Sequence, residues 1–262
     1  MLGLVLWQAA GLASGLLLLT LAATLALAPL GSTHEKALRH LSDAGPLTFA
    51  AGLFGLTVLG RLLTVLAAST FSTVRARHHN RVLVDLVSER NLLLKGASVV
   101  DHDVPVAYCL PGLRPRVVLS RGALSLLSYD ELAAVLAHER AHLVQRHDLV
   151  VLPFVALGAT FPGVAGVRTA RAEVALLIEL LADDQAARHH QRAHLAGALW
   201  KIGTGEAPIG ALGAGGEDML LRAQRLLDPP DRLGRLRSSL VLLASAAIAG
   251  SPLVGIALPV LV

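Results

Sequence analysis

The chain has 262 residues, of which 54% are hydrophobic and only 16% are charged, and its mean hydropathy is +0.61. This composition argues against an ordinary soluble domain and favours a membrane protein. The formal charge of +4 would suit nucleic-acid binding, but aromatic residues make up only 3% and the arginines lie beside apolar stretches, so we expect no direct contact with nucleic acid. A single cysteine, Cys109, excludes an internal disulfide framework.

Three apolar segments are long enough to cross a bilayer, which takes ~20 residues of helix. Residues 2–30 carry no charge, and we expect this segment to be retained because it lacks the positively charged start of a signal peptide. Residues 46–70 are interrupted by Arg61, which we interpret as snorkelling towards the interface. Residues 238–262 form the third segment. These segments predict a multi-pass protein of the cell membrane.

The arginines between the second and third segments predict the orientation of the chain. Those nearest the two segments are Arg75, Arg77, Arg81, Arg232, Arg235 and Arg237. The loop at residues 31–45 instead balances two basic residues against two acidic ones, so the positive-inside rule makes it extracellular. We therefore predict two transmembrane helices in residues 1–71, a cytoplasmic membrane-associated domain in residues 72–236, and a C-terminal transmembrane helix in residues 237–262.

The cytoplasmic segment is predicted to be mainly α-helical with a small β-sheet. Residues 98–122 contain short β-rich runs broken by prolines and a glycine, which is typical of a small sheet. Ser128 and Glu131 then fit a capping box at the start of a helix. A further helix is expected from about residue 169 to residue 201.

The helix that follows the capping box contains AVLAHERAHL, a His-Glu-x-x-His pattern. Residues four apart lie on one helix face, so His138 and His142 can direct their imidazoles at one metal ion, for which zinc is the best fit. Glu139 lies about 100° around the helix from His138, where it can act as a general base towards water. Two histidines leave a third ligand to be found.

Glu179 and Asp183 lie four residues apart in a later predicted helix and offer the missing carboxylates. Glu179 follows a strongly apolar run, where an unpaired carboxylate would be costly, so we predict that it is the third zinc ligand. Asp183 is predicted to accept a hydrogen bond from a ligand imidazole and to fix its tautomer. The alternative for both residues is a solvated acidic patch on a surface helix.

Four segments together resemble the BlaR/MecR-type membrane zinc metallopeptidases, which are antirepressor proteases related more distantly to HtpX-type and CAAX prenyl proteases. They are PVAYCLPGLRPRVVLSRGALSLLSYDELAAVLAHERAHL, RHDL, ELLADDQA and RAQRLLDPP, within roughly residues 100–235. The resemblance implies a zincin-like metalloprotease domain with zinc as its cofactor. It also implies the same roles for four residues, namely His138, His142 and Glu179 as ligands and Glu139 as the base.

The chain departs from that family at two points. Such peptidases usually place an acidic residue five positions after the second histidine, where this chain has His147, followed by Asp148. A helix-ending or ligand-supporting role for Asp148 is therefore doubtful. The best-known members also carry an extracellular penicillin-sensing domain after the last span, whereas this sequence stops at Val262, so we do not carry over a role as a β-lactam receptor.

Residues 149–167 separate the histidines from Glu179 and are apolar enough to be mistaken for another span. If they crossed the bilayer, Glu179 would lie about 30 Å from the histidines and could not share their metal. Their prolines and glycines favour a broken, re-entrant or interfacial hairpin that returns to the same side.

Three other sites give weaker signals. Asp101, His102 and Asp103 are interpreted as a polar turn between strands, and Cys109 as a small packed side chain. Arg222 and Arg225 are assigned either to substrate and oxyanion contacts or to lipid headgroups.

The sequence as a whole predicts a zinc endopeptidase whose substrate is a cytosolic protein, in particular a BlaI/MecI-type transcriptional repressor, or the protease itself. Besides that substrate, its expected partner is the lipid bilayer. The sequence does not decide whether the chain forms a homo-oligomer. The alternatives are an HtpX-like housekeeping protease and a membrane sensor with a non-catalytic zinc site.

Overall fold

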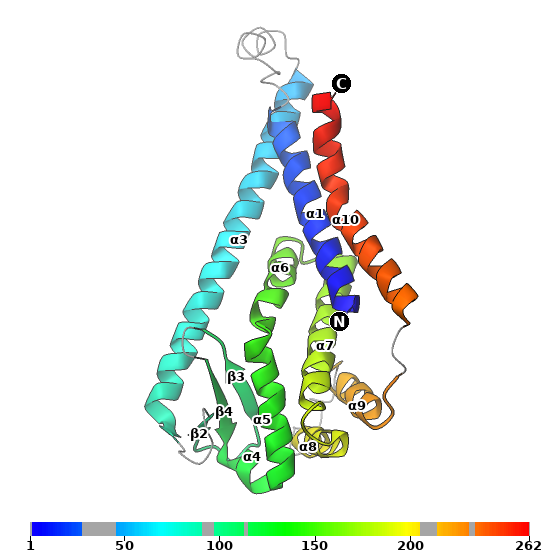
Figure 1. Cartoon of the computed structure of the whole chain (residues 1–262). Helices are drawn as coiled ribbons and strands as arrows, with labels where there is room; N and C mark the ends of the chain where they lie inside the picture. The colour runs from blue at the N-terminus through cyan, green and yellow to red at the C-terminus, as the bar shows by residue number, and fades with distance from the viewer. Residues whose placement is uncertain are drawn as a thin grey trace. The chain divides into compact units, whose positions relative to one another are not determined.

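The computed structural model describes most of the chain, and Figure 1 shows the order of its elements. The described residues are 2–27, 46–90, 97–112, 115–204, 214–230 and 234–261. Within them the protein is mainly helical and carries one small sheet, as predicted. The predicted extracellular loop at residues 31–45 lies outside the described residues.

The chain divides into two compact units. One unit consists mainly of Ser72–Leu152 and Ala172–Leu233 and is called the polar unit below. The other consists of Leu2–Phe71, Pro153–Arg171 and Gly234–Val262 and is called the apolar unit. The polar unit holds all the residues that were predicted to bind metal.

The apolar unit is built on three long helices that coincide with the predicted spans. They are α1 (Leu2–Leu27), the first part of α3 (Pro46–Val87) and α10 (Arg235–Leu261), and α1 packs against α10 (Figure 1). Apolar side chains such as Leu53 and Leu243 point outwards. By length and composition, one stretch of the described helices, Gly52–Ser69, could cross a membrane. Three crossings therefore stay a prediction.

The sheet of the polar unit has the strand order β1-β2-β4-β3. Its strands are β1 (Ser88–Arg90), β2 (Ala97–Val100), β3 (Ala107–Leu110) and β4 (Arg116–Ser120). β2 and β4 pair in parallel, and the two outer strands pair antiparallel to them. The predicted small sheet is therefore present, and one outer strand, β3, packs against the helix that carries the His-Glu-x-x-His pattern.

The connection between β2 and β3 folds as the predicted polar turn. His102 Nδ1 accepts a hydrogen bond from the backbone N–H of Val104 at 3.1 Å, and both residues are exposed. The loop also passes very close to Gly122, where a Cβ atom would lie 1.8 Å from the Asp103 carbonyl oxygen. Only glycine fits at that position.

The central helix of the polar unit is α5 (Tyr129–Val144), which follows the short α4 (Arg121–Leu126). The predicted capping box is present, because the Ser128 side chain accepts from the Glu131 N–H while the Glu131 carboxylate accepts from the Ser128 N–H. Leu136 packs on the sheet residues Val117 and Leu119. The cap and this apolar face fix the rotation of α5.

The remaining helices return the chain to α5. Their order is α6 (His147–Thr160), α7 (Ala165–Ala186), α8 (Arg192–Thr204) and α9 (Ala214–Leu227). α6 continues through Pro153, and the reversal of direction comes at residues 161–164. The chain therefore returns to the histidines after this turn. That the hairpin at residues 149–167 is re-entrant or interfacial in a bilayer stays a prediction.

The single helix predicted from residue 169 to residue 201 is wrong, because the structure has two. α7 ends at Ala186, whose carbonyl accepts hydrogen bonds from the backbone of His189 and His190 in a turn. α8 then packs against α5 and α9, and Leu195 joins a core with Ala134. Tertiary packing, which the local sequence does not report, overrides the continuous helical pattern.

Candidate metal centre

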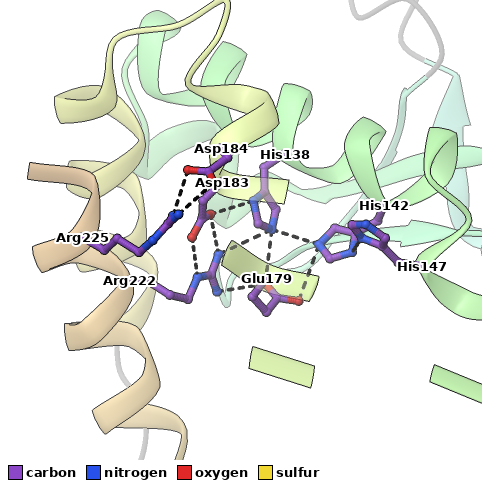
Figure 2. Close-up of polar contacts among 8 residues, drawn as sticks. All are labelled: His138, His142, His147, Glu179, Asp183, Asp184, Arg222 and Arg225. Atoms are coloured by element: carbon purple, nitrogen blue, oxygen red, sulfur yellow. Dashed lines mark hydrogen bonds and ion pairs between the residues drawn. The ribbon is translucent and has the colours of Figure 1, made fainter. Parts of the chain in front are cut away.

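Two histidines on α5 direct their rings to one point. His138 is buried and His142 is half-buried, and their Nε2 atoms lie 3.1 Å apart (Figure 2). The spacing of four residues places both on one face of the helix, as predicted. Two ring nitrogens that face each other so closely need a proton or a cation between them, because each otherwise presents a lone pair to the other.

Glu179 on α7 completes a triangle of ligand atoms with the two histidines. Its Oε2 lies 3.3 Å from His138 Nε2, and its Oε1 lies 3.5 Å from His142 Nε2. The structure thus brings together the three predicted ligands, which form the one group of metal-binding side chains found among the described residues.

The size of this triangle fits zinc. A tetrahedral site with bonds of about 2.0–2.1 Å has ligand atoms about 3.3 Å apart. The two ring nitrogens lie 3.1 Å apart, and each lies 3.3 or 3.5 Å from a different oxygen of the Glu179 carboxylate, so all three separations lie around that value. Two imidazoles and one carboxylate are also the ligands of open, catalytic zinc sites.

Asp183 lies one helical turn beyond Glu179 and contacts the other nitrogen of His138. Its Oδ1 is 2.9 Å from His138 Nδ1, although the N–H does not point straight at the oxygen. Asp183 is fully buried. The position is the one predicted for it, next to a ligand imidazole whose tautomer it can fix.

Arg222 on α9 joins the two carboxylates and was only partly anticipated from the sequence. It donates two hydrogen bonds of 2.8 Å to the Asp183 carboxylate, and its Nη1 lies 2.9 Å from Glu179 Oε2. Its side chain is 12% exposed. This pairing favours a role at the site over the alternative of lipid anchoring.

Arg225, one turn further along α9, forms a second bidentate pair. Both of its terminal nitrogens donate to the Asp184 carboxylate at 2.8 Å (Figure 2). The two neighbouring aspartates of α7 therefore each form an ion pair with one arginine of α9, Asp183 with Arg222 and Asp184 with Arg225. This double pairing fixes α9 beside the metal centre.

The charges at the site balance with a dication. Glu139, Glu179 and Asp183 contribute three negative charges when ionised, and Arg222 contributes one positive charge. A remainder of two negative charges in a largely buried cluster is costly, and a divalent metal ion removes it.

The ring nitrogens show where a proton resides when no metal is bound. Burial opposes the protonation of His138, but its contacts with Asp183 and Glu179 outweigh this effect and raise its pKa to about 9. Burial, together with the nearby His138, lowers the pKa of His142 to about 4. Without a metal, His138 is therefore the more basic of the two rings, and its Nε2 faces the Nε2 of His142 at 3.1 Å.

Burial also opposes ionisation of Asp183, but the hydrogen bonds from Arg222 and the contact with His138 bring its pKa down to about 2. Asp183 is therefore an anion throughout the physiological range. Its charge is matched from two sides, by Arg222 and by the protonated or metal-bound His138.

Glu139, the predicted base, is half-buried and lies against strand β3. Burial raises its pKa, and Cys109 on β3 is its hydrogen-bond partner. Burial and the Glu139 charge raise the pKa of the Cys109 thiol to about 12. In the absence of a metal the Cys109 thiol therefore stays protonated beside Glu139.

His147 was noted in the sequence only as a departure from a family pattern. The structure places it in contact with His142, as Figure 2 shows. It is buried at the first position of α6.

Comparison with known proteins gives one match. Residues 74–197 match the profile of Peptidase family M48. The matched range contains both histidines, Glu139, Glu179 and Asp183, and it ends before α9. This similarity supports a metallopeptidase of the kind that includes HtpX and CAAX proteases. No curated protein and no solved structure matches the chain.

Proposed function

We propose that this chain is a zinc-dependent endopeptidase of the membrane. The observation that carries the proposal is the cluster of His138, His142 and Glu179, whose ring nitrogens lie 3.1 Å apart and each face one carboxylate oxygen within 3.5 Å, so that the three side chains could hold a zinc ion. The similarity of residues 74–197 to Peptidase family M48 supports the same class of enzyme. Glu139 follows the first ligand in the chain and so lies beside the metal position.

The residues divide the work of peptide hydrolysis. Zinc held by the three ligands would supply a Lewis acid that polarises the scissile carbonyl and lowers the pKa of water. The Glu139 carboxylate accepts the proton of the attacking water and returns it to the leaving nitrogen. Burial raises the pKa of Glu139, so the carboxylate is a stronger base than an exposed glutamate.

Arg222 is suited to stabilise the negative charge that develops on the carbonyl oxygen. Its Nη2 lies 3.5 Å from His138 Nε2, at the edge of the ligand triangle. The pairing with Asp183 holds the guanidinium in place before substrate arrives, so little reorganisation is needed during the reaction.

The substrate we propose is a cytosolic protein, in particular a transcriptional repressor cut in response to a signal. The supporting observation is the set of arginines that flank the apolar helices, which by the positive-inside rule directs residues 72–236 to the cytoplasm. Three transmembrane helices and an active site at the membrane surface belong to the same proposal.

A second candidate is a housekeeping protease that degrades damaged membrane proteins, which the match to Peptidase family M48 favours equally. Comparing the proteins that accumulate in a deletion strain distinguishes the two. One accumulated repressor indicates regulation, whereas many accumulated membrane proteins indicate quality control. A non-catalytic zinc sensor is the third candidate, but a structural site needs no base such as Glu139.

The decisive variant for the enzymatic proposal is Glu139→Gln in the purified full-length chain. We expect the rate of proteolysis to fall by about 10²–10⁴-fold, because the general base is lost, while the zinc content stays unchanged. Glu173→Gln is the matched control, since it makes the same change at an exposed position of α7. Equal proteolysis by Glu139→Gln and the control would refute the assignment of the base.

A further inference from the structure

His147 bridges a predicted zinc ligand and an amide side chain. Its Nδ1 lies 2.9 Å from His142 Nδ1, and its Nε2 lies 3.0 Å from Gln145 Oε1. His147 is 4% exposed, so water does not compete for these contacts. Its ring stands almost perpendicular to that of His142, at an interplanar angle of 85°.

The chemistry of these three side chains allows one arrangement of protons. The Gln145 oxygen can only accept, so His147 Nε2 carries a hydrogen and His147 Nδ1 is left as an acceptor. His142 Nδ1 must then be the donor across the 2.9 Å contact. With its hydrogen on Nδ1, His142 presents the lone pair of Nε2 to the triangle it forms with His138 and Glu179.

The backbone between α5 and α6 is built to bring His147 into this position. α5 ends at Val144 with Gln145 as its C-cap, and Arg146 adopts a φ of 50°, the left-handed region that a residue with a side chain rarely enters. This residue separates α5 from α6, and His147 directly after it contacts both Gln145 and His142. The left-handed conformation of Arg146, which costs roughly 1 kcal/mol, is thus retained close to His142, a proposed zinc ligand.

We propose that His147 is a positioning residue that fixes the tautomer and orientation of His142 through a neutral relay ending at Gln145. The inference rests on the proposed zinc site. His138 receives the corresponding support from the carboxylate of Asp183. The two histidine ligands are therefore held by chemically different partners, one anionic and one neutral.

The test measures zinc affinity in the purified full-length chain by competition with a chromogenic chelator. His147→Leu keeps much of the volume and removes the acceptor, whereas His147→Asp removes volume and supplies a carboxylate acceptor. We expect zinc binding about 10- to 100-fold weaker for His147→Leu, as for other lost partners of ligand histidines, and within about threefold of the unaltered chain for His147→Asp. His189→Leu, the same change at an exposed histidine, is the matched control.

If His147 acted in packing alone, zinc affinity would be near normal in His147→Leu and impaired in His147→Asp, and that order would overturn the proposal.

Gln145→Leu, at a half-buried position, provides a second variant that should fold. It removes the group that fixes the tautomer of His147, so we expect zinc binding to weaken by about three- to tenfold. Unchanged affinity in Gln145→Leu would refute the relay. Failure of the unaltered chain to bind zinc would instead refute the proposed function itself.

Discussion

The two histidines that we propose as zinc ligands lie one helical turn apart, yet their surroundings differ. His138 is buried against the ionised Asp183, which in turn is held by Arg222 from α9. His142 is less buried and contacts the uncharged His147, which in turn contacts Gln145 at the α5–α6 turn. One ligand is therefore supported by long-range ion pairs, and the other by a short local relay.

This difference indicates how each half of the site responds to change. The His138 half depends on charges that neutralise one another in a buried place, so the loss of one partner leaves another uncompensated. The His142 half contains no net charge, so the loss of one partner removes a hydrogen bond and little more. We expect larger losses of stability from the first half than from the second.

The largest expected effect is that of Asp183→Leu. It leaves the buried Arg222 with Glu179 as its remaining carboxylate partner, so the free energy of unfolding should fall by about 3 kcal/mol and zinc binding should weaken about 10- to 100-fold. Chemical denaturation and chelator competition measure the two effects. The double variant Asp183→Leu with Arg222→Met should recover most of the stability, because a buried pair replaced on both sides is nearly neutral.

If Asp183→Leu lowers the stability and the double variant does not restore it, the charge-based explanation of the surroundings of His138 is contradicted. Such a result would show that Asp183 contributes by packing rather than by its charge.

The pH dependence of zinc binding separates the two histidines. In the metal-free protein the pKa of His138 is raised to about 9, so its proton stabilises the fold below the unfolded pKa of about 6.5 and this contribution is lost as the pH rises through 9. Zinc must displace that proton. We therefore expect the affinity for zinc to fall by about tenfold for each pH unit below 9, as measured by calorimetry from pH 6 to pH 8.

In Asp183→Asn the same profile should shift towards lower pH, because the anion that raises the pKa of His138 is gone. If the affinity for zinc does not change between pH 6 and pH 8, zinc does not displace a proton from His138 in this range, which would contradict the raised pKa of that residue.

A half-exposed ion pair at the other end of α5 provides a smaller effect for comparison. Lys201 Nζ lies 2.7 Å from Glu131 Oε2, and the two side chains are 42% and 10% exposed. Lys201→Met should lower the free energy of unfolding by about 1 kcal/mol, because solvent screens the pair. Arg121→Met, in a pair that is exposed on both sides, is the control and should cost almost nothing.

The pair also has a defined pH dependence. Burial opposes ionisation of Glu131, but Lys201 and the Ser128 backbone lower its pKa. The stabilisation is therefore present above the unfolded pKa of about 4.3 and is lost as the pH falls below it. Denaturation between pH 3 and pH 6 should show a shallower slope in Lys201→Met, and an unchanged slope would contradict the pairing.

The smallest effect is expected for Arg146→Gly, at the turn before His147. Arg146→Gly should raise the free energy of unfolding by up to about 1 kcal/mol, since glycine enters the left-handed region freely, and Arg146→Val should lower it by about 1–2 kcal/mol. Thermal denaturation of the two variants and of the unaltered chain measures this order of stability. Zinc affinity should stay unchanged in Arg146→Gly, and a reversed order of stability would contradict the conformation of this turn.

The sequence predicted the two histidines, Glu179 and Asp183, but it only partly anticipated Arg222 and did not predict the contact of His147. His138, His142 and Glu139 follow from a spacing of four residues within one helix, and the capping box at Ser128 and Glu131 gave the start of that helix. Helical periodicity is a local property, so these predictions needed no knowledge of the fold.

Arg222 and His147 show why the rest could not be predicted. Arg222 reaches Asp183 across 39 positions in the sequence, through the packing of α9 beside α7. His147 contacts His142 only because Arg146 adopts a positive φ, which its residue type does not indicate. Two arginines three residues apart on a short amphipathic segment, Arg222 and Arg225, were the available signal for the first, and no signal in the sequence indicated the second.

X-ray absorption at the zinc edge of the purified, zinc-loaded chain tests the central claim most directly. We expect one zinc per chain, with two imidazoles and oxygen ligands at about 2.0–2.1 Å, and one imidazole fewer in His142→Ala. A sulfur ligand at about 2.3 Å, which only Cys109 or a methionine could supply, or the absence of bound zinc, would contradict it.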